Sequence, residues 1–328
     1  MKNNSLSEIA KIMERADSLL FLTHVIIDGD AAGSAAALCR VMEGMGKTAH
    51  VYAGEELPNN IKFLEYESFI NNEEDLLEEY DLTVAMDCSD TGRFENRAAC
   101  YDKGKVSINI DHHMTNAGYA DYNYVDGDAA AAGEIVFRLI KTAGWDIDAK
   151  TAEALYVAIV TDTGQFQYSS TTSETHRIAA ELIDKGIDLN TISVNVYQSV
   201  RKLKYILQGE ILRTVEFREN DRFAIAFADQ DMFKRTGSEI QDSDGIVELL
   251  RDIDTVEVSA FAKETAPGVM KLGFRSKYDI NVGELSAKFG GGGHAKAAGC
   301  TVNGGIEDVK KAIYPEISKL FENRKSRS

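Results

Sequence analysis

Residues 19–46 read LLFLTHVIIDGDAAGSAAALCRVMEGMG: an apolar run, a polar turn and an alanine-rich segment closed by glycine. The short run at 19–23 is typical of a strand that is buried on both faces of a sheet. The alanine-rich residues 33–45 favour a helix, and Gly46 is the kind of residue that often lies just beyond a helix end. A buried strand that passes through a polar turn into a helix is the repeating unit of α/β folds.

The same unit recurs along the first half of the chain. Ser5 and Glu8 have the spacing of a capping box, and they begin an amphipathic helix that ends near residue 16. Further strands are expected at 49–52, 82–86 and 106–110, and further helices at 130–143, 149–160 and 173–185. This alternation predicts an α/β domain with a doubly wound, mostly parallel sheet.

The pattern changes in the second half. Residues 190–215 are nearly all helical in character. Beyond them we expect strands at 223–227, 256–262 and 270–274, a turn at 266–268 between the last two, and a closing helix at 307–321. The predicted division is therefore a first domain at 1–189, a helical connector at 190–215 and a smaller α+β domain at 216–328, with a cleft between the two domains.

Composition restricts the class of partner. The chain has 328 residues and a formal net charge of −17. Proteins that bind long nucleic acid usually carry a basic stripe that displaces counterions from many phosphates. An acidic chain repels such a polyanion, so a phosphate-containing ligand is expected to be small and to be bound locally. Long nucleic acid is thereby excluded as a partner.

The sequence predicts neither a membrane span nor a thiolate site. No stretch approaches the ~20 consecutive apolar residues that a span needs, and the N-terminus has no apolar signal region. None of the cysteines forms a C-x-x-C pair, and all four are expected to be small core residues: Cys39, Cys88, Cys100 and Cys300. We expect a cytoplasmic protein without a membrane partner.

Polar side chains gather where the predicted strands end. Four clusters hold them, at 23–34, 87–93, 111–113 and 161–164, the last at the end of a helix. Each cluster is a weak signal alone, since Asp30, for example, could simply cap the following helix. Together they would bring carboxylates and imidazoles to one edge of the sheet, where ligands gather in doubly wound folds. Like charges at that spacing repel one another, and divalent cations remove the repulsion.

The types of ligand narrow the choice of metal. Oxygen-rich ligands with an imidazole for each ion, and no thiolate, suit Mn²⁺, with Mg²⁺ or Co²⁺ as alternatives, better than a structural zinc. Two such ions about 3.5–4 Å apart would activate a water and hold phosphoryl oxygens for in-line attack. The clusters therefore predict a phosphoesterase that depends on two divalent metal ions.

Two motifs extend this prediction. The triplet Asp111-His112-His113 is one, and the other joins Phe274-Arg275-Ser276 to the run GGGGHAKAAG at 290–299. The first resembles the signature of the DHH phosphoesterase family, and the second resembles the G-G-G-H-x-x-A-A-G signature of the associated DHHA1 domain. The resemblance covers essentially the whole chain and is greatest to the nanoRNase/pAp-phosphatase members. It implies a catalytic DHH domain at 1–189, a substrate-binding DHHA1 domain at 216–328, and a homodimer.

The resemblance also implies roles for single residues. One metal ion would be held by His24, Asp28 and Asp87, and the second by Asp30, Asp87, His112 and Asp162, so that Asp87 bridges them. His113 would face the substrate phosphate and stabilise developing charge. Asp111 would orient a histidine without binding a metal ion itself. The catalytic residues implied are thus His113, Asp111 and Asp87.

Substrate binding is expected to involve both domains. The residues implied are Arg93, Arg275, Ser276, Gly291, Gly292, Gly293 and His294. Successive glycine amides can form an anion-binding concavity, and an arginine can add a bidentate phosphate contact. The alternative for four glycines in a row is a flexible surface loop.

The function predicted is hydrolysis of short oligoribonucleotides, about 2–5 nucleotides long, to mononucleotides, and of 3′-phosphoadenosine 5′-phosphate (pAp) to AMP. One alternative is a phosphodiesterase for linear dinucleotides such as pApA or pGpG, which would use the same site. Another is a non-catalytic nucleotide sensor on the same scaffold, which typically lacks some metal ligands. A manganese pyrophosphatase would lack the G-G-G-H run, and a processive single-strand DNA exonuclease would carry further domains.

Overall fold

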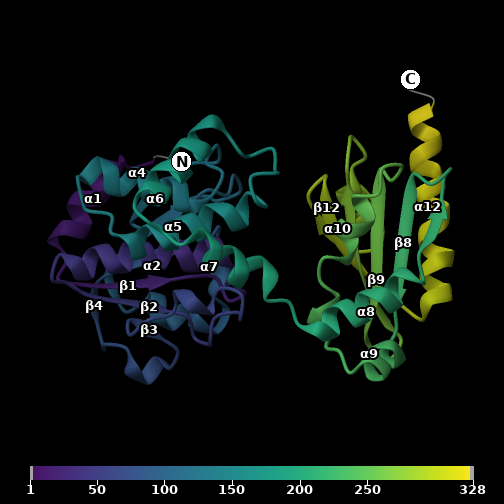
Figure 1. The fold of residues 1–328 in the computed structure, drawn as a ribbon, viewed down its shortest axis with the longest axis horizontal. Helices are drawn as coiled ribbons and strands as arrows, with labels where there is room; N and C mark the ends of the chain where they lie inside the picture. Colours follow the sequence, from purple (N-terminus) through teal and green to yellow (C-terminus); the bar gives the residue numbers. More distant parts are fainter. Residues whose placement is uncertain (1–2, 326–328) are drawn as a thin grey trace. The chain divides into compact units, whose positions relative to one another are not determined.

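The computed structural model describes residues 3–325, and the chain divides into two compact units, Met1–Ser199 and Val200–Ser328. Figure 1 shows both units, coloured along the sequence. The division falls inside the segment 190–215 that was expected to be a connector. Within the described part of the chain, no helix has the length and apolar character needed to cross a membrane.

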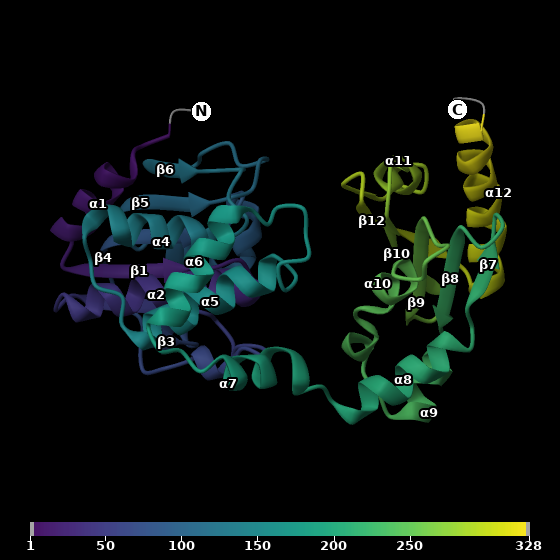
Figure 2. The same cartoon turned by 45° about the horizontal axis from the view of Figure 1, so that its top comes forward.

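The first unit is built on a six-stranded sheet whose strand pairs are all parallel, in the order β3-β2-β1-β4-β5-β6. The strands are β1 (Ser18–Leu22), β2 (Thr48–Tyr52), β3 (Phe69–Ile70), β4 (Tyr80–Met86), β5 (Gly104–Asp111) and β6 (Tyr122–Val125). Figure 2 shows β1, β4, β5 and β6 side by side. Because β1, β4 and β5 are parallel neighbours, the residues that follow them meet at one edge of the sheet.

Helices bury both faces of this sheet. The α-helices of the first unit include α1 (Leu6–Arg15), α2 (Gly29–Gly44), α3 (Ala98–Tyr101), α4 (Ala132–Ala143), α5 (Ala149–Asp162) and α6 (Ser173–Asp184). Leu19 and Phe21 point into the core formed with α1, α2, α4 and α5. Leu20 and Leu22 alternate to the opposite face, where they pack with Phe94 from the short helix η3 (Thr91–Arg97). The predicted doubly wound α/β domain is confirmed.

Helix α2 begins at Gly29, earlier than the start expected near residue 33. Asp28 is its N-cap, because the Oδ1 atom of Asp28 accepts a hydrogen bond from the Ala31 amide at 3.0 Å. Gly29 and Gly33 face α5 so closely that a Cβ atom on either would lie 2.4 Å from an oxygen of α5. This contact places the first turn of α2 beside the last turn of α5.

The segment 190–215 is less continuous than its sequence indicates. Helix α7 (Leu189–Ser193) runs into a π-helical turn, η4 (Val194–Gln198), and a new helix, α8 (Lys202–Leu212), begins after a break. Arg201 has an extended ψ of 132°, and its guanidinium forms an ion pair with Glu239 at 2.9 Å. Helix propensity cannot reveal a break whose partner lies in another part of the chain.

The second unit is a mixed sheet in the order β11-β12-β10-β9-β8-β7. Its strands are β7 (Glu216–Arg218), β8 (Phe223–Ala228), β9 (Val258–Ala266), β10 (Val269–Ser276), β11 (Gly292–Gly293) and β12 (Ala297–Asn303). One face packs against α12 (Ile306–Lys325) and α11 (Val282–Ala287). The other face packs against α8, α9 (Gln230–Thr236) and α10 (Ile246–Arg251), as Figure 1 shows for α10 and α12. The predicted α+β architecture is confirmed.

Candidate metal centre

His24 and Asp28 lie in the turn between β1 and α2. His24 is 2% exposed, and its Nε2 atom lies 3.7 Å from Asp28 Oδ2 and 3.7 Å from Asp87 Oδ2. The capping bond from Ala31 occupies Asp28 Oδ1, so the Oδ2 atom of Asp28 is the one that faces His24. The cap that the sequence offered as an alternative role for Asp30 is therefore made by Asp28, whose other carboxylate oxygen faces His24.

Asp30 lies in the first turn of α2 and is 1% exposed. Its Oδ1 atom accepts hydrogen bonds from Ser34 Oγ (3.0 Å) and the Gly133 amide (2.9 Å), and its Oδ2 atom accepts one from the Ala132 amide (2.6 Å). The two amides belong to the first turn of α4, where unpaired N–H groups and the helix dipole favour a negative charge. The carboxylate is thus held in place by main-chain donors from another helix.

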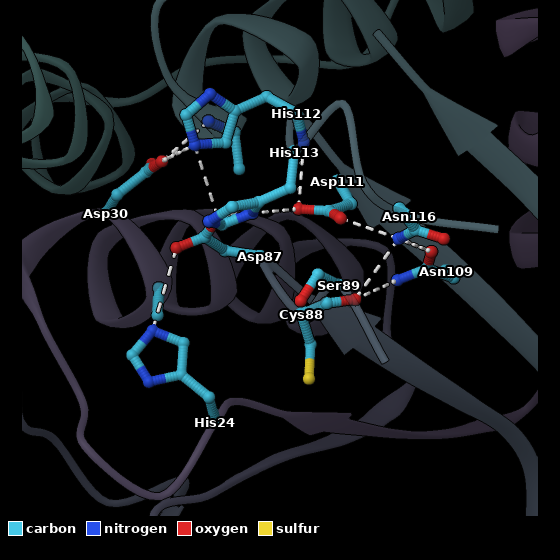
Figure 3. A network of polar contacts seen from close by, with 12 residues as sticks. His24, Asp30, Asp87, Cys88, Ser89, Asn109, Asp111, His112, His113 and Asn116 are labelled. Carbon is cyan, nitrogen blue, oxygen red and sulfur yellow. Dashed lines mark hydrogen bonds and ion pairs between the residues drawn. The ribbon is translucent and has the colours of Figure 1, made fainter. Parts of the chain in front are cut away.

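Asp87 follows β4 and lies at the centre of the cluster, between His24 and the two adjacent histidines (Figure 3). Its Oδ1 atom is 3.4 Å from His112 Nε2 and 3.4 Å from His113 Nδ1. The backbone φ of Asp87 is +52°, in the left-handed region. A non-glycine residue there carries strain of about 1–3 kcal/mol and persists only when its surroundings fix it.

Asp111, His112 and His113 follow one another at the end of β5. Asp111 is fully buried, and its Oδ1 atom accepts hydrogen bonds from the His112 amide (2.9 Å) and from His113 Nδ1 (2.7 Å). His112 Nδ1 donates to the Ala129 carbonyl at 3.2 Å, which turns its Nε2 atom toward the carboxylates. The Nε2 atom of His112 lies 3.8 Å from Asp30 and 3.5 Å from Asp162, the last residue of α5.

The structure thus brings together all six predicted metal ligands, together with Asp111 and His113. They form three overlapping groups whose potential ligand atoms lie within 4.8 Å of one another: His24, Asp28 and Asp87; Asp30, His112 and Asp162; and Asp87, His112 and His113. Asp87 and His112 each belong to two groups. This overlap is the arrangement expected of residues that serve neighbouring cations.

The donor set fits divalent cations. The nitrogen–oxygen distances of 3.4–3.8 Å exceed the roughly 2.7–3.2 Å of an N–H···O hydrogen bond. Within the part of the chain that the structure describes, the buried Asp87 Oδ1 atom has no hydrogen-bond partner. A buried carboxylate oxygen without a partner is costly, and cation binding would satisfy it. Carboxylate and imidazole ligands without thiolate match Mn²⁺ or Mg²⁺.

The predicted substrate-binding residues are divided between the units. Arg93 is half-buried in η3, and among residues 3–325 its side chain has no hydrogen bond or ion pair. Arg275 lies on β10, where its Nε atom pairs with Glu248 of α10 at 2.9 Å. Ser276 ends β10 and is buried, and His294 is exposed in the turn between β11 and β12. Arg275 pairs in register with Ala297, so the turn that holds His294 adjoins Arg275.

The glycines at 290–293 have a packing role. A Cβ atom on Gly291 would lie 2.2 Å from the Gly299 carbonyl oxygen, and one on Gly293 would lie 2.6 Å from the Ala297 carbonyl oxygen. The amides of Gly290 and Gly291 donate to carbonyls of the chain before them, and β11 pairs with β12. Absence of a side chain lets this segment lie against β12, and these amides are already engaged in main-chain hydrogen bonds.

Known proteins with similar sequences share both units. Residues 18–159 match the DHH family, N-terminal domain, and residues 220–323 match the DHHA1 domain. A bifunctional oligoribonuclease and PAP phosphatase NrnA from Thermus thermophilus is 32% identical, and the match covers 95% of this chain and 94% of the relative. The chain belongs to the DHH family.

Two further proteins agree with this membership. A NrnA of the same description from Bacillus subtilis is 27% identical, with 90% of this DHH-family chain and 93% of the relative covered. The crystal structure of an exopolyphosphatase-related protein from Bacteroides fragilis superposes with a TM-score of 0.88 at 27% identity, and it covers 96% of this chain and 95% of that protein. The whole DHH and DHHA1 architecture is therefore shared.

Several residues that support this DHH-family site were not predicted from the sequence. Arg97 is 6% exposed, and its Nη1 atom donates to the His24 carbonyl at 3.4 Å. The segment 129–133 supplies the carbonyl that orients His112 and the amides that hold Asp30. The only sequence signal for that segment is its run of small residues. Small residues fit the close packing there, because a Cβ atom on Gly133 would lie 2.6 Å from the Ala158 Cβ atom.

The clustered carboxylates raise the pKa values of two histidines of the site, and burial together with these charges raises the pKa of one aspartate. Burial alone would lower the pKa of His24, but the carboxylates of Asp28 and Asp87 outweigh it and raise that pKa to about 9. Burial is likewise outweighed at His112, where Asp87, Asp30 and Asp162 raise the pKa to about 10. Burial, with the charges of Asp87 and Asp162 added, raises the pKa of Asp30. Without metal, imidazolium protons therefore balance the carboxylates of this DHH-family site.

We expect the stabilisation of the protein by Mn²⁺ to increase with pH. The pKa values of His24 and His112, about 9 and about 10, lie above the unfolded value of about 6.5. Their protons stabilise the metal-free fold most fully below about pH 6.5, and this stabilisation is lost as the pH rises through those values. Metal ligation requires neutral imidazoles, so Mn²⁺ binding strengthens over the same range. The Tm difference between Mn²⁺ and EDTA should therefore widen from about pH 6.5 to about pH 8.

Thermal melts at several pH values in each buffer measure this difference. The Asp87→Asn variant is the control, because its weakened site should show little Mn²⁺ stabilisation at any pH. A Tm difference in the unsubstituted protein that stays constant or narrows with rising pH would contradict the assignment of these histidines as ligands.

Proposed function

We propose that this DHH-family chain is a metal-dependent phosphoesterase that hydrolyses short oligoribonucleotides to mononucleotides and pAp to AMP. The observation that carries the proposal is the convergence of His24, Asp28, Asp30, Asp87, His112 and Asp162 at one edge of the first sheet. The relatives named as oligoribonuclease and PAP phosphatase match almost the full length of the chain, which supports the same activities here.

Two divalent cations, Mn²⁺ before Mg²⁺ or Co²⁺, are the proposed cofactors. His24, Asp28 and Asp87 would hold one, and Asp30, Asp87, His112 and Asp162 the other. When bound, such ions lower the pKa of a water ligand and neutralise charge on phosphoryl oxygens. The hydrogen bonds that Asp30 and His112 make to main-chain groups would hold their metal-binding atoms in position before a substrate binds.

His113 is the proposed donor to the phosphate undergoing hydrolysis. Its Nδ1–H bond to Asp111 fixes the plane of the ring and leaves the Nε2 atom free to contact a substrate. The hydrogen bond to Asp111 also raises the pKa of His113, which favours the doubly protonated form. A fixed cationic donor is suited to stabilising the negative charge that develops on a phosphate oxygen.

The proposed substrates are small because only local groups attract them. The net charge of −17 disfavours a long polyanion, whereas Arg93 and Arg275 each offer a guanidinium to one phosphate. Arg275 is paired with Glu248, so a substrate phosphate would replace a carboxylate at that guanidinium. Ser276, His294 and the glycines at 291–293 adjoin Arg275 through strands β10 to β12 and are proposed to contact the same end of the substrate.

Arg275→Ala is expected to raise KM for a five-nucleotide RNA about tenfold, the effect of losing one charge-assisted contact of about 1.5 kcal/mol. The value of kcat should change little, because Arg275 lies outside the metal-binding unit. Steady-state kinetics at saturating Mn²⁺ give both values. Arg251→Ala is a matched control, since Arg251 is also on the second unit and also pairs with an acidic residue, Asp252. An unchanged KM in Arg275→Ala would remove this arginine from the substrate site.

Product analysis with purified protein and Mn²⁺ tests the proposed function. The substrates are pAp, pApA, a five-nucleotide RNA, an RNA of about 24 nucleotides and pyrophosphate, with Asp87→Ala as the inactive control. Consumption of pAp and the short RNAs, with survival of the long RNA, is the expected result. Consumption of pApA alone would assign the protein to linear dinucleotide hydrolysis. No consumption with any divalent metal would show a binding protein instead.

A further inference from the structure

One main-chain oxygen next to Asp87 is held by three side chains. The Cys88 carbonyl accepts hydrogen bonds from Asn109 Nδ2 (3.2 Å), Asn116 Nδ2 (3.2 Å) and Tyr119 Oη (3.0 Å). Figure 3 shows the two asparagines converging on this carbonyl. The NH₂ groups of Asn109 and Asn116 each share two hydrogens among three acceptors, and the Cys88 carbonyl is an acceptor common to both.

Asn116 also connects the ends of two strands. Its Nδ2 group lies 2.5 Å from Asp111 Oδ2 and 2.7 Å from Asn109 Oδ1, and its Oδ1 atom accepts from the Gly118 amide at 2.8 Å. Asp111 ends β5 and holds His113, whereas Cys88 follows the end of β4 and adjoins Asp87. A single 5%-exposed amide therefore fixes the spacing between the carboxylate of Asp87 and the histidines after β5.

The conformation of Asp87 depends on such anchors. Its φ of +52° is unfavourable for aspartate, and its amide donates to the Ile110 carbonyl at 3.0 Å. The chain is thus held on one side of Asp87 by a β5 carbonyl and on the other by the bonds to Cys88. Strained backbone of this kind persists where the surroundings over-determine it, and it is found at functional sites.

We propose that Asn109, Asn116 and Tyr119 are positioning residues that hold Asp87 in its left-handed conformation and thereby set the metal affinity of the site. This inference rests on the proposed metal centre. Tyr119 contributes through its hydroxyl, which also accepts from Asn109 at 3.1 Å, while its ring packs against Phe94. Asn109 and Asn116 are buried and Tyr119 is half-buried, and because the three share hydrogen bonds, removing any one donor is expected to loosen the peptide that follows Asp87.

Tyr119→Phe tests the proposal with the least change in packing. It removes only the hydroxyl, and we expect the Mn²⁺ dissociation constant, measured by titration calorimetry, to rise by about 3–10-fold. Tyr80→Phe is the matched control. Tyr80 is fully buried at the opposite end of β4, and its hydroxyl also bonds the main chain, at the Leu77 amide. The control should lower Tm without weakening Mn²⁺ binding, because it does not touch the Cys88 carbonyl.

Asn116→Ala removes the connection between the two strand ends, and its Mn²⁺ affinity should fall about 10–100-fold. The KM for pAp at saturating Mn²⁺ should stay near the unsubstituted value, since Asn116 is buried behind the ligands. If Asn116→Ala does not fold, the Mn²⁺ affinity of Tyr119→Phe alone tests the inference. If folded Tyr119→Phe binds Mn²⁺ as tightly as the unsubstituted protein does, this inference is overturned and the proposed function is not affected. If the unsubstituted protein binds no Mn²⁺, the proposed function fails together with it.

Discussion

Asp87→Asn is expected to lower kcat for pAp and for short RNA on the order of 10⁴-fold or more, the scale of losing a group on which the whole catalytic assembly depends. Asp87 contacts His24 through one carboxylate oxygen and His112 and His113 through the other. Asparagine keeps the shape of the side chain but removes its charge and one of its two oxygen ligands.

The measurement is kcat at saturating Mn²⁺, together with Mn²⁺ stoichiometry from calorimetry. Asp81→Asn is the control, because Asp81 is the same residue type on the same strand, where it accepts hydrogen bonds from the Asp17 and Ser18 amides. It should retain activity within a few-fold. An Asp87→Asn enzyme with more than about a tenth of the original kcat would refute the bridging role.

His113→Gln is expected to lower kcat about 10²–10³-fold, the usual effect of removing one donor that stabilises transition-state charge. Mn²⁺ affinity should change much less, because the six proposed ligands are all retained. KM should also change little, since the lost contact is strongest in the transition state. Steady-state kinetics and calorimetry on the same protein preparation separate these effects.

His50→Gln is a suitable control for His113→Gln. His50 lies on β2 and pairs with Tyr80 Oη at 2.7 Å, remote from the carboxylates of the site. Its replacement should affect Tm more than kcat. If His113→Gln instead loses one equivalent of bound Mn²⁺, His113 is itself a ligand, as its membership of a group with Asp87 and His112 allows.

The sequence was sufficient to predict which side chains gather at the site. His24 and Asp87 each follow a strand and Asp111 ends one, and parallel neighbouring strands in a doubly wound sheet end at the same edge. Strands β1, β4 and β5 could be predicted from short apolar runs in the sequence. Such runs arise because strands of this kind are buried on both faces of the sheet. Edge strands β3 and β6 have few buried residues and left no such signal.

The supporting residues could not be predicted in the same way. Asn109 and Asn116 are buried amides whose partners lie on other segments, so neither periodicity nor spacing along the chain marks them. Arg97 likewise contacts His24 across 73 positions of sequence. The expected start of α2 near residue 33 is wrong because alanine content marks only the body of the helix, whereas the Asp28 cap and the close contact with α5 determine where it begins.

The segment 129–133 orients a histidine and a carboxylate entirely through main-chain atoms. Substitution by any residue other than proline leaves the main-chain donors and acceptor of this segment in place, so we expect side-chain volume, more than chemical type, to limit which residues the segment accepts. A comparison of distant homologues that considers only polar residues would not detect this segment. A comparison that weighs tolerance for small side chains at the start of α4 would instead detect it, and would distinguish chains that preserve this support from those that have lost it.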